Sequence, residues 1–277
     1  MRRALLTSLV VAVATVSLAF LALPIAAVFT HTSPGRLLHQ LSNPVVTDAL
    51  VVSLRTSLVA QALILLLGTP TAYLLARHRF PGRSAAVTLV ELPLVLPPAV
   101  AGVGLLAAFG RFGLLGSSLR AVGVTLPFTQ SAVTVAVAYV ASPLYIRQAI
   151  AAFEAVDPRL VSASRTLGAG PARTFFRVSL PLASGGLAAG LALSFARGLG
   201  EFGATIMFAG SLQRVTQTLP LAIYAEFLDN FDATLAMSGT LVLISVVLLL
   251  GLRIGLTWRA DSSSTTFASL SGPSTSH

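Results

Sequence analysis

The 277-residue chain is 55% hydrophobic before its 22 glycines are counted, and only 10% of its residues are charged. Soluble domains average about 45–50% apolar residues with glycine included and about 25% charged residues, so this composition excludes an ordinary water-soluble surface. The 18 basic residues are all arginine and leave a formal charge of +9. They lie at the ends of apolar runs rather than in one patch, which favours a membrane over nucleic acid as the partner.

The missing residue types exclude several kinds of site. Without lysine the chain has no P-loop lysine, and without cysteine it has neither thiolate metal ligands nor disulfides. The four histidines are scattered singly, so no metal cluster is indicated. We therefore expect no nucleotide site, no cofactor and no metal, and no enzymatic activity in this chain itself.

Six windows are long and apolar enough to cross a hydrocarbon core of about 30 Å. The predicted spans are residues 5–29, 55–76, 85–109, 125–147, 179–200 and 233–256. The first exceeds the apolar length of a secretory signal, so we favour a span over a cleaved leader. The fold class is thus all-α integral membrane protein, with a permease domain over 1–258 and a Ser/Thr-rich tail, 259–277, predicted to be disordered and cytoplasmic.

Arginine distribution predicts the orientation of these spans. With the N-terminus inside, twelve arginines fall on the cytoplasmic side and six on the other. Cytoplasmic segments retain positive charge, so both termini are predicted to be cytoplasmic.

Two features predict irregular membrane segments. Pro93, Pro97 and Pro98 remove backbone donors from the third window, which should be kinked or interrupted. The charge-poor stretches Phe202–Gln213 and Val215–Ala225 are too short to span and have the length of re-entrant or interfacial segments.

Residues 151–178 form the one large predicted cytoplasmic segment. Asp157 reads as an N-cap followed by Pro158 in the first turn, and Gly168 stands where a left-handed C-cap would end the helix. A second short helix is expected over Ala172–Val178. One apolar stripe follows at helical spacing on the first helix: Leu160, Ala163 and Leu167. By itself this pattern fits an interfacial helix as well as a docking helix.

The spacing of this segment resembles a known signature. It reads Ser162-Ala163-Ser164, three residues, Gly168, nine residues, Val178, one residue, Leu180-Pro181. This is similar to the EAA signature of bacterial ABC-importer permeases, although serine stands at the positions of its Glu and second Ala. The resemblance implies that the segment is a coupling helix that inserts into an ATPase subunit. The implied ATPase-coupling residues are Asp157, Leu160, Ser162, Ala163, Ser164, Leu167, Gly168, Leu180 and Pro181.

The likeness extends over most of the chain and is most specific in Ala196–Gly210 and Thr216–Tyr224. Together with Gly68–Arg77 these segments resemble molybdate ABC-transporter permeases. Sulfate and thiosulfate permeases share part of the pattern and tungstate is a near-isostere, so those substrates stay open. The resemblance implies a type I ABC importer permease fold with a cytoplasmic coupling helix, in a prokaryotic plasma membrane. It also implies the partners: an ABC ATPase dimer, an extracytoplasmic molybdate-binding protein and a second copy of this chain.

The fifth window and the segment after it carry further candidate residues. Small residues recur every fourth position, which predicts close helix packing: Gly186, Gly190, Ser194 and Gly198. Arg197 and Glu201 lie four apart and are predicted to form an ion pair near the outer mouth, with direct substrate contact as the alternative. Candidate path residues, chosen for polarity alone, are Thr205, Ser211, Thr216, Gln217 and Thr218. An ATP-independent anion channel and an intramembrane enzyme are the alternative functions from other classes.

Overall fold

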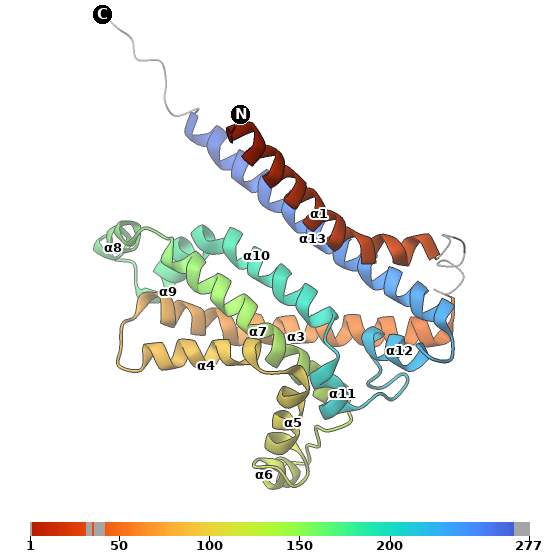
Figure 1. Ribbon diagram of the computed structural model, residues 1–277. Helices are drawn as coiled ribbons and strands as arrows, with labels where there is room; N and C mark the ends of the chain where they lie inside the picture. The colour runs from red at the N-terminus through yellow and green to blue at the C-terminus, as the bar shows by residue number, and fades with distance from the viewer. Residues whose placement is uncertain (1, 32–34, 36–41, 269–277) are drawn as a thin grey trace, which may run out of the picture.

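The computed structural model describes residues 2–31, 35 and 42–268, and every regular element in this part of the chain is helical. The elements in chain order, labelled in Figure 1, are α1 (Arg2–His31), α3 (Pro44–Arg77), α4 (Arg83–Val95), α5 (Pro98–Phe109), α6 (Gly116–Ala121), α7 (Gln130–Glu154), α8 (Pro158–Thr166), α9 (Pro171–Thr174), a π-helical turn (Phe175–Ser179), α10 (Leu180–Leu199), α11 (Gly203–Ala209), α12 (Leu219–Glu226) and α13 (Phe231–Ala268).

The centre of the molecule is a bundle in which α7 packs against both α3 and α10. At the end near α8, a buried cluster contains Tyr145 and Phe153 of α7 and Leu187 of α10. At the opposite end a second cluster joins α7 to α5 and α11 around Phe208. The two clusters stack along α7, so this helix connects the segment that carries α8 to the region that carries α11.

Helices α3 and α7 begin where their capping residues lie. Asn43 Oδ1 accepts a hydrogen bond from the Val45 amide at 2.9 Å, and Thr129 Oγ1 accepts one from the Ala132 amide at 3.3 Å. Helix α3 therefore starts well before the predicted span at 55 and includes Asp48, a charged residue that the prediction left outside the span. Asp48 is accommodated because it pairs with Arg214 at 2.9 Å.

The third predicted span is interrupted, as its prolines indicate. Helices α4 and α5 are bent by 116° at the Leu96–Pro97 break. Gly203 of α11 packs into this break, since a Cβ atom there would lie 2.7 Å from Pro98 Cβ. The proline-rich sequence thus redirects α5 and makes room for the start of α11.

The sequence predicted a separate short helix over Ala172–Val178 before the fifth span, and the structure differs here. The chain from Pro171 to Leu199 forms one continuous helix through the π-helical turn. In that turn the Leu180 amide donates to the Phe175 carbonyl, five residues earlier. A widened turn of this kind accommodates the ring of Pro181, which would otherwise clash with the preceding turn.

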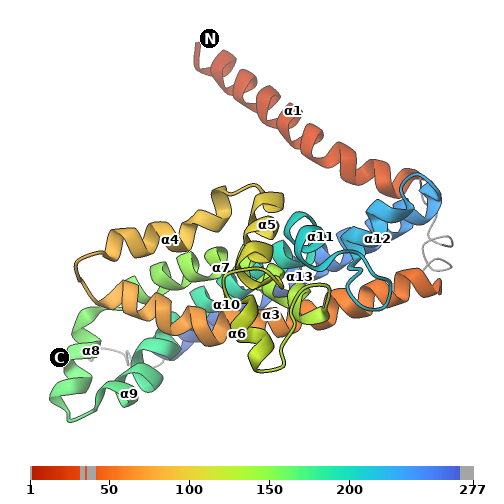
Figure 2. The same ribbon diagram turned by 90° about the horizontal axis from the view of Figure 1, so that it is seen from below.

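Helices α1 and α13 stand partly apart from the bundle. Helix α1 contacts α13 and extends away from the other helices (Figure 2). None of its apolar residues 6–31 is buried. Helix α13 continues to Ala268, ten residues into the predicted tail, because no proline or glycine interrupts 257–268. Residues 269–277 of that tail lie outside the described residues.

The described helices account for four or five of the six predicted membrane crossings. Four of them are long and apolar enough to span: α1, α3, α7 and the continuous helix Pro171–Leu199. The bent pair α4–α5 makes a fifth if it crosses as one unit, and the apolar part of α13, Phe231–Val247, is shorter. Six spans, and the domain boundary at 258, stay predictions.

Candidate functional site

Helix α8 has the local structure that its sequence predicts. Asp157 Oδ1 accepts a hydrogen bond from the Arg159 amide at 2.8 Å, and Pro158 occupies the first turn. At the other end Gly168 has a φ of +83°, a conformation that glycine adopts without a Cβ clash. Both ends of α8 are therefore fixed by residues within the segment itself.

The predicted apolar stripe of α8 faces away from the molecule. Leu160 is 49% exposed and Leu167 87% exposed, and Ala163 between them is exposed as well. The helix is instead anchored by Val161, which is buried in the same cluster as Phe153. An exposed apolar stripe on a firmly anchored helix is typical of a surface that contacts another protein or the membrane surface.

The two serines of the signature lie in different environments. Ser164 Oγ lies 3.2 Å from Oγ1 of the buried Thr174, so this hydrogen bond ties α8 to α9. Ser162 is exposed. Leu180 packs against the cluster beneath α8, whereas Pro181 is exposed on α10. Leu180 and Pro181 thus belong to the base of the segment rather than to its exposed stripe.

The small residues of α10 face α7. A Cβ atom on Gly186 would lie 2.5 Å from Ala152 Cβ, and one on Gly198 would lie 2.9 Å from Val137 Cγ1. A Cβ atom on Gly190 would lie 3.0 Å from Gln148 Cβ. The fourth position, Ser194, is fully buried and donates to Gln61 Oε1 of α3 at 2.9 Å. This face brings the α7 and α10 backbones close together and adds a polar link to α3.

Glu201 lies buried at the junction of α10 and α11. Its Oε2 is 2.8 Å from Arg197 Nη2, and its Oε1 accepts a hydrogen bond from the Ala204 amide at 2.8 Å. The carboxylate is 1% exposed and the guanidinium 33% exposed. One buried carboxylate therefore pairs with the end of α10 and caps the start of α11, which fixes the angle between these two helices.

The polar residues after α11 lie mostly inside the subunit. Thr205, Thr216, Gln217 and Thr218 are buried, and Ser211 is exposed. The Thr216 hydroxyl accepts a hydrogen bond from the Leu212 amide at 2.9 Å, which closes the loop. The hydroxyls of Thr205 and Thr218 are buried without a hydrogen-bond partner among the described residues. The structure does not gather the five residues on one open surface.

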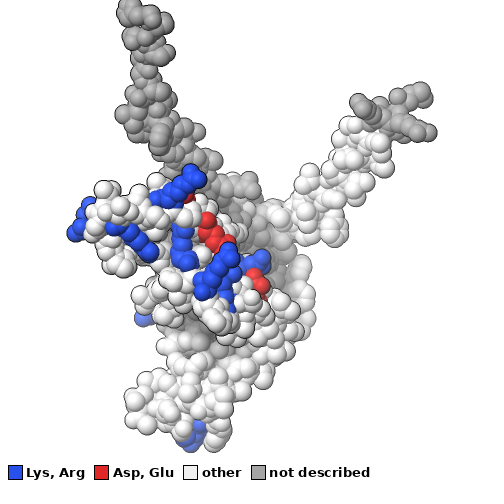
Figure 3. Space-filling model, turned by 90° about the vertical axis from the view of Figure 1, so that its left-hand side faces the viewer, with Lys and Arg blue, Asp and Glu red and all other residues white. Residues whose placement is uncertain are grey.

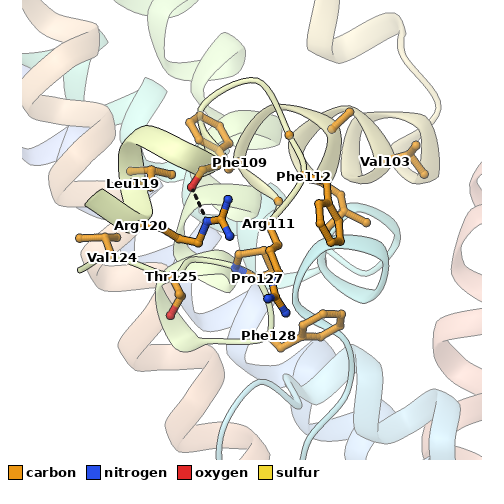
Figure 4. Close-up of a pocket in the computed structure, with 15 residues that line it drawn as sticks. Val103, Phe109, Arg111, Phe112, Leu119, Arg120, Val124, Thr125, Pro127 and Phe128 are labelled. Atoms are coloured by element: carbon orange, nitrogen blue, oxygen red, sulfur yellow. Dashed lines mark hydrogen bonds between the residues drawn. The ribbon is translucent and has the colours of Figure 1, made fainter. Parts of the chain in front are cut away.

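A cavity of about 870 Å³ lies between α5, α6 and the chain leading to α7. Its lining is mostly apolar, but it includes Arg111 and Arg120, whose side chains lie among aromatic residues in Figure 4. Arg120 Nε donates to the Gly116 carbonyl at 3.3 Å, and the Arg111 guanidinium lies 5.6 Å from the centre of the Phe112 ring. Phe112 itself is 94% exposed.

Sequence reasoning used Arg111 and Arg120 only to assign orientation. The sequence did hold a signal for a functional role of these two residues. They occur among glycines and aromatic residues in a connection that the prediction places on the arginine-poor side. Arginines on that side run against the general charge distribution of membrane proteins, which points to a local role.

A family model for binding-protein-dependent transport system inner membrane components matches residues 64–256. The chain belongs to this family. The match covers α7, α8, α9 and α10, so the signature in 162–181 and the exposed helix α8 lie inside the shared domain.

Relatives with molybdenum in their names match over most of their length. The molybdenum transport system permease protein ModB of Mycobacterium tuberculosis is 41% identical over 234 residues, which cover 84% of this chain and 88% of the relative. A probable molybdenum ABC transporter permease of Haloferax volcanii is 40% identical, with 83% of each chain covered. ModB of Escherichia coli K12 is 43% identical over 178 residues, covering 64% of this chain and 78% of the relative.

Solved structures share the fold at lower identity. A chain of a bacterial alginate ABC transporter, in complex with its alginate-bound periplasmic protein, superposes with a TM-score of 0.67 at 17% identity, covering 91% of this chain and 93% of that one. A chain of the inward-facing methionine transporter MetNI gives 0.61 at 19% identity, covering 77% and 95%. The fold is therefore that of the membrane subunits of type I ABC importers, as predicted.

Proposed function

We propose that this permease is the membrane-spanning subunit of an ATP-driven importer that carries molybdate across the prokaryotic inner membrane. The observation that carries the proposal is 41% identity to a molybdenum permease over 84% of the chain. An oxyanion cannot cross hydrocarbon unaided, because burying an uncompensated charge costs many kcal/mol. A protein-lined path driven by a separate ATPase meets this requirement.

Energy enters this permease through α8. Its exposed stripe of Leu160, Ala163 and Leu167 docks into a partner ATPase, and Val161 transmits movement of the helix to the Phe153 cluster. Because the stripe contributes little to the fold of the chain itself, it is free to be buried differently in two ATPase states. That difference in contact is the source of the coupling free energy.

The orientation follows from α8 being cytoplasmic. Both termini then lie inside, while the α5–α6 cavity and the α11–α12 region lie near the outer surface, where a molybdate-binding protein delivers its cargo. Two copies of the chain enclose the path, with two ATPases inside. No apolar residue is buried in 6–31 of α1 or in α4, so their apolar surfaces are available to lipid and to the second copy.

Hydroxyl groups after the Glu201 junction contact the passing anion. Thr205 and Thr218 support this, since their buried hydroxyls have no partner among the described residues and are available as donors. Exposed Ser211 and the neighbouring Thr216 and Gln217 complete the proposed set. A movement of α11 relative to α10, whose junction Glu201 fixes, would expose these groups in one state of the transport cycle and cover them in the other.

Uptake by the reconstituted complex tests the proposed function. Vesicles that hold the permease and its ATPase, with binding protein outside, should accumulate labelled molybdate only when ATP is present on the α8 side. Sulfate in excess should leave this uptake unchanged. Uptake without ATP would indicate a channel, and stronger displacement by sulfate than by unlabelled molybdate would contradict the substrate.

A further inference from the structure

A second cavity, of about 650 Å³, lies beside the start of α8. It is formed by the C-terminal end of α3, the N-terminal end of α4, the last residue of α7 and the first residue of α8. The residues that define it are Arg77, Arg79, Phe80, Arg83, Glu154 and Pro158. Figure 3 looks onto this end of the molecule, where basic side chains gather with fewer acidic ones between them.

The charges in this cavity are not balanced by the protein. Glu154 is already paired with Arg83, at 2.9 Å. Arg77 donates from Nη2 to the Val156 carbonyl, but its Nε is buried without a hydrogen-bond partner. Among the described residues, no hydrogen bond or ion pair holds the exposed Arg79. Two guanidinium groups thus lack a counter-charge among the described residues: Arg79, and Arg77 with its unpartnered Nε. A ligand that satisfies both charges is an anion.

The position of the cavity identifies the kind of anion. Arg77 ends the apolar helix α3 and Arg83 begins the apolar helix α4, so the cavity lies at the level where two membrane helices leave the hydrocarbon. No residue of α4 is buried, and Leu89, Leu92 and Val95 are exposed along it. Lipid headgroups occupy this level, and their acyl chains would lie along α4. One guanidinium group can donate two parallel hydrogen bonds to two oxygens of the same phosphate.

We propose that this cavity binds the phosphate of an anionic phospholipid headgroup. The occupied cavity links the α3–α4 end to the entry of the coupling helix, because Arg77 holds Val156 and Arg83 holds Glu154, which both precede the Asp157 cap. Bound lipid therefore stiffens the base of α8 and raises the efficiency of coupled transport. This consequence rests on the proposed function, whereas binding of the lipid does not.

The test measures lipid retained by the purified complex of permease and ATPase. The complex is equilibrated with vesicles of equal parts phosphatidylglycerol and phosphatidylcholine, extracted in mild detergent and analysed by mass spectrometry. Wild type should retain phosphatidylglycerol preferentially. Arg79→Gln and Arg77→Gln should each reduce this preference about fivefold, as expected for one arginine near the headgroup. Arg173→Gln, an exposed arginine at the same end that does not line the cavity, should leave it unchanged.

Three results would overturn the lipid site. One is an equal preference in wild type and Arg79→Gln, since this exposed residue is not needed for folding. Another is binding of inorganic phosphate alone, without arginine-dependent retention of phosphatidylglycerol. A third is retention by the isolated permease that disappears when the ATPase assembles, which would assign the cavity to the ATPase contact. Because retention is measured without transport, a failed uptake assay would not affect this outcome.

Discussion

The exposed helix α8 and the buried junction between α10 and α11 solve different physical problems in the same chain. Helix α8 is fixed at its ends by Asp157 and Gly168 and leaves its apolar stripe to solvent. The junction buries Glu201 against Arg197 and the Ala204 amide. The contrast teaches that a surface proposed to bind a partner need not stabilise its own subunit, whereas a helix angle within the membrane must be held by buried contacts. Substitutions in the two regions should therefore separate transport from stability.

The largest expected loss of stability comes from Glu201→Gln. The substitution leaves Arg197 without its counter-charge at a site where the carboxylate is 1% exposed. We expect the free energy of unfolding to fall by about 2–4 kcal/mol, near the lower part of the range for broken buried pairs because Arg197 is partly exposed. Unfolding in detergent measures this. Arg214→Gln, which breaks the exposed pair with Asp48, is the control and should cost less than about 1 kcal/mol. Equal losses would contradict a special role for the junction.

Gly186→Ala should give the next largest effect. The added Cβ atom would lie 2.5 Å from Ala152 Cβ, so α7 and α10 must separate. Overpacking of this kind costs about 1–3 kcal/mol, which thermal unfolding should detect. Gly104→Ala in α5 has nothing within 4 Å of the new atom and should be neutral or slightly stabilising. If both variants behave alike, the close approach of α7 and α10 is not needed for stability.

The double substitution Leu160→Asp and Leu167→Asp tests the other region. Both residues are exposed, so stability should change by less than about 0.5 kcal/mol. ATP-dependent uptake should fall by about tenfold or more, because two charges would be buried against the ATPase. Normal uptake in this variant would contradict the proposal that α8 is the coupling surface. A large loss of stability would instead mean that the stripe packs within the subunit.

The smallest effect on transport, and a small one on stability, is expected at the two serines of the signature. Ser164→Ala removes the hydrogen bond to Thr174 and should cost about 0.5–1.5 kcal/mol. Ser162→Ala, at an exposed position two residues earlier, should leave stability unchanged. The difference between these variants, measured by unfolding, checks whether α8 is tied to α9. A greater loss at Ser162 would contradict the assigned orientation of the helix.

The sequence predicted the features that depend on neighbouring residues. The ends of α8 follow from Asp157, Pro158 and Gly168, and the break between α4 and α5 follows from consecutive prolines, since caps and prolines act on the backbone next to them. The bend angle of 116° did not follow, because it depends on Gly203 packing against Pro98 from a distant segment. The early start of α3 was missed because Asp48 is compensated by Arg214, far away in the chain.

The candidate site residues also divide into features that neighbouring residues determine and features that distant contacts determine. The spacing of Gly186, Gly190, Ser194 and Gly198 was sufficient to predict a flat face, and the structure packs that face against α7. Polarity alone could not say whether Thr216 faces a path or its own loop, and its hydroxyl holds the Leu212 amide. The cavity between α3, α4, α7 and α8 was also beyond prediction: its three arginines are close in sequence, but only the fold brings Glu154 and Pro158 beside them.

One measurement tests the central claim most directly. The chain contains no cysteine, so Leu167→Cys provides a unique thiol on the exposed stripe of α8. A membrane-impermeant maleimide should label this thiol only from the cytoplasmic side of membrane vesicles, and assembly with the ATPase should protect it. Labelling from the opposite side, or labelling that the ATPase does not change, would contradict transmission of ATP-driven movement through this helix.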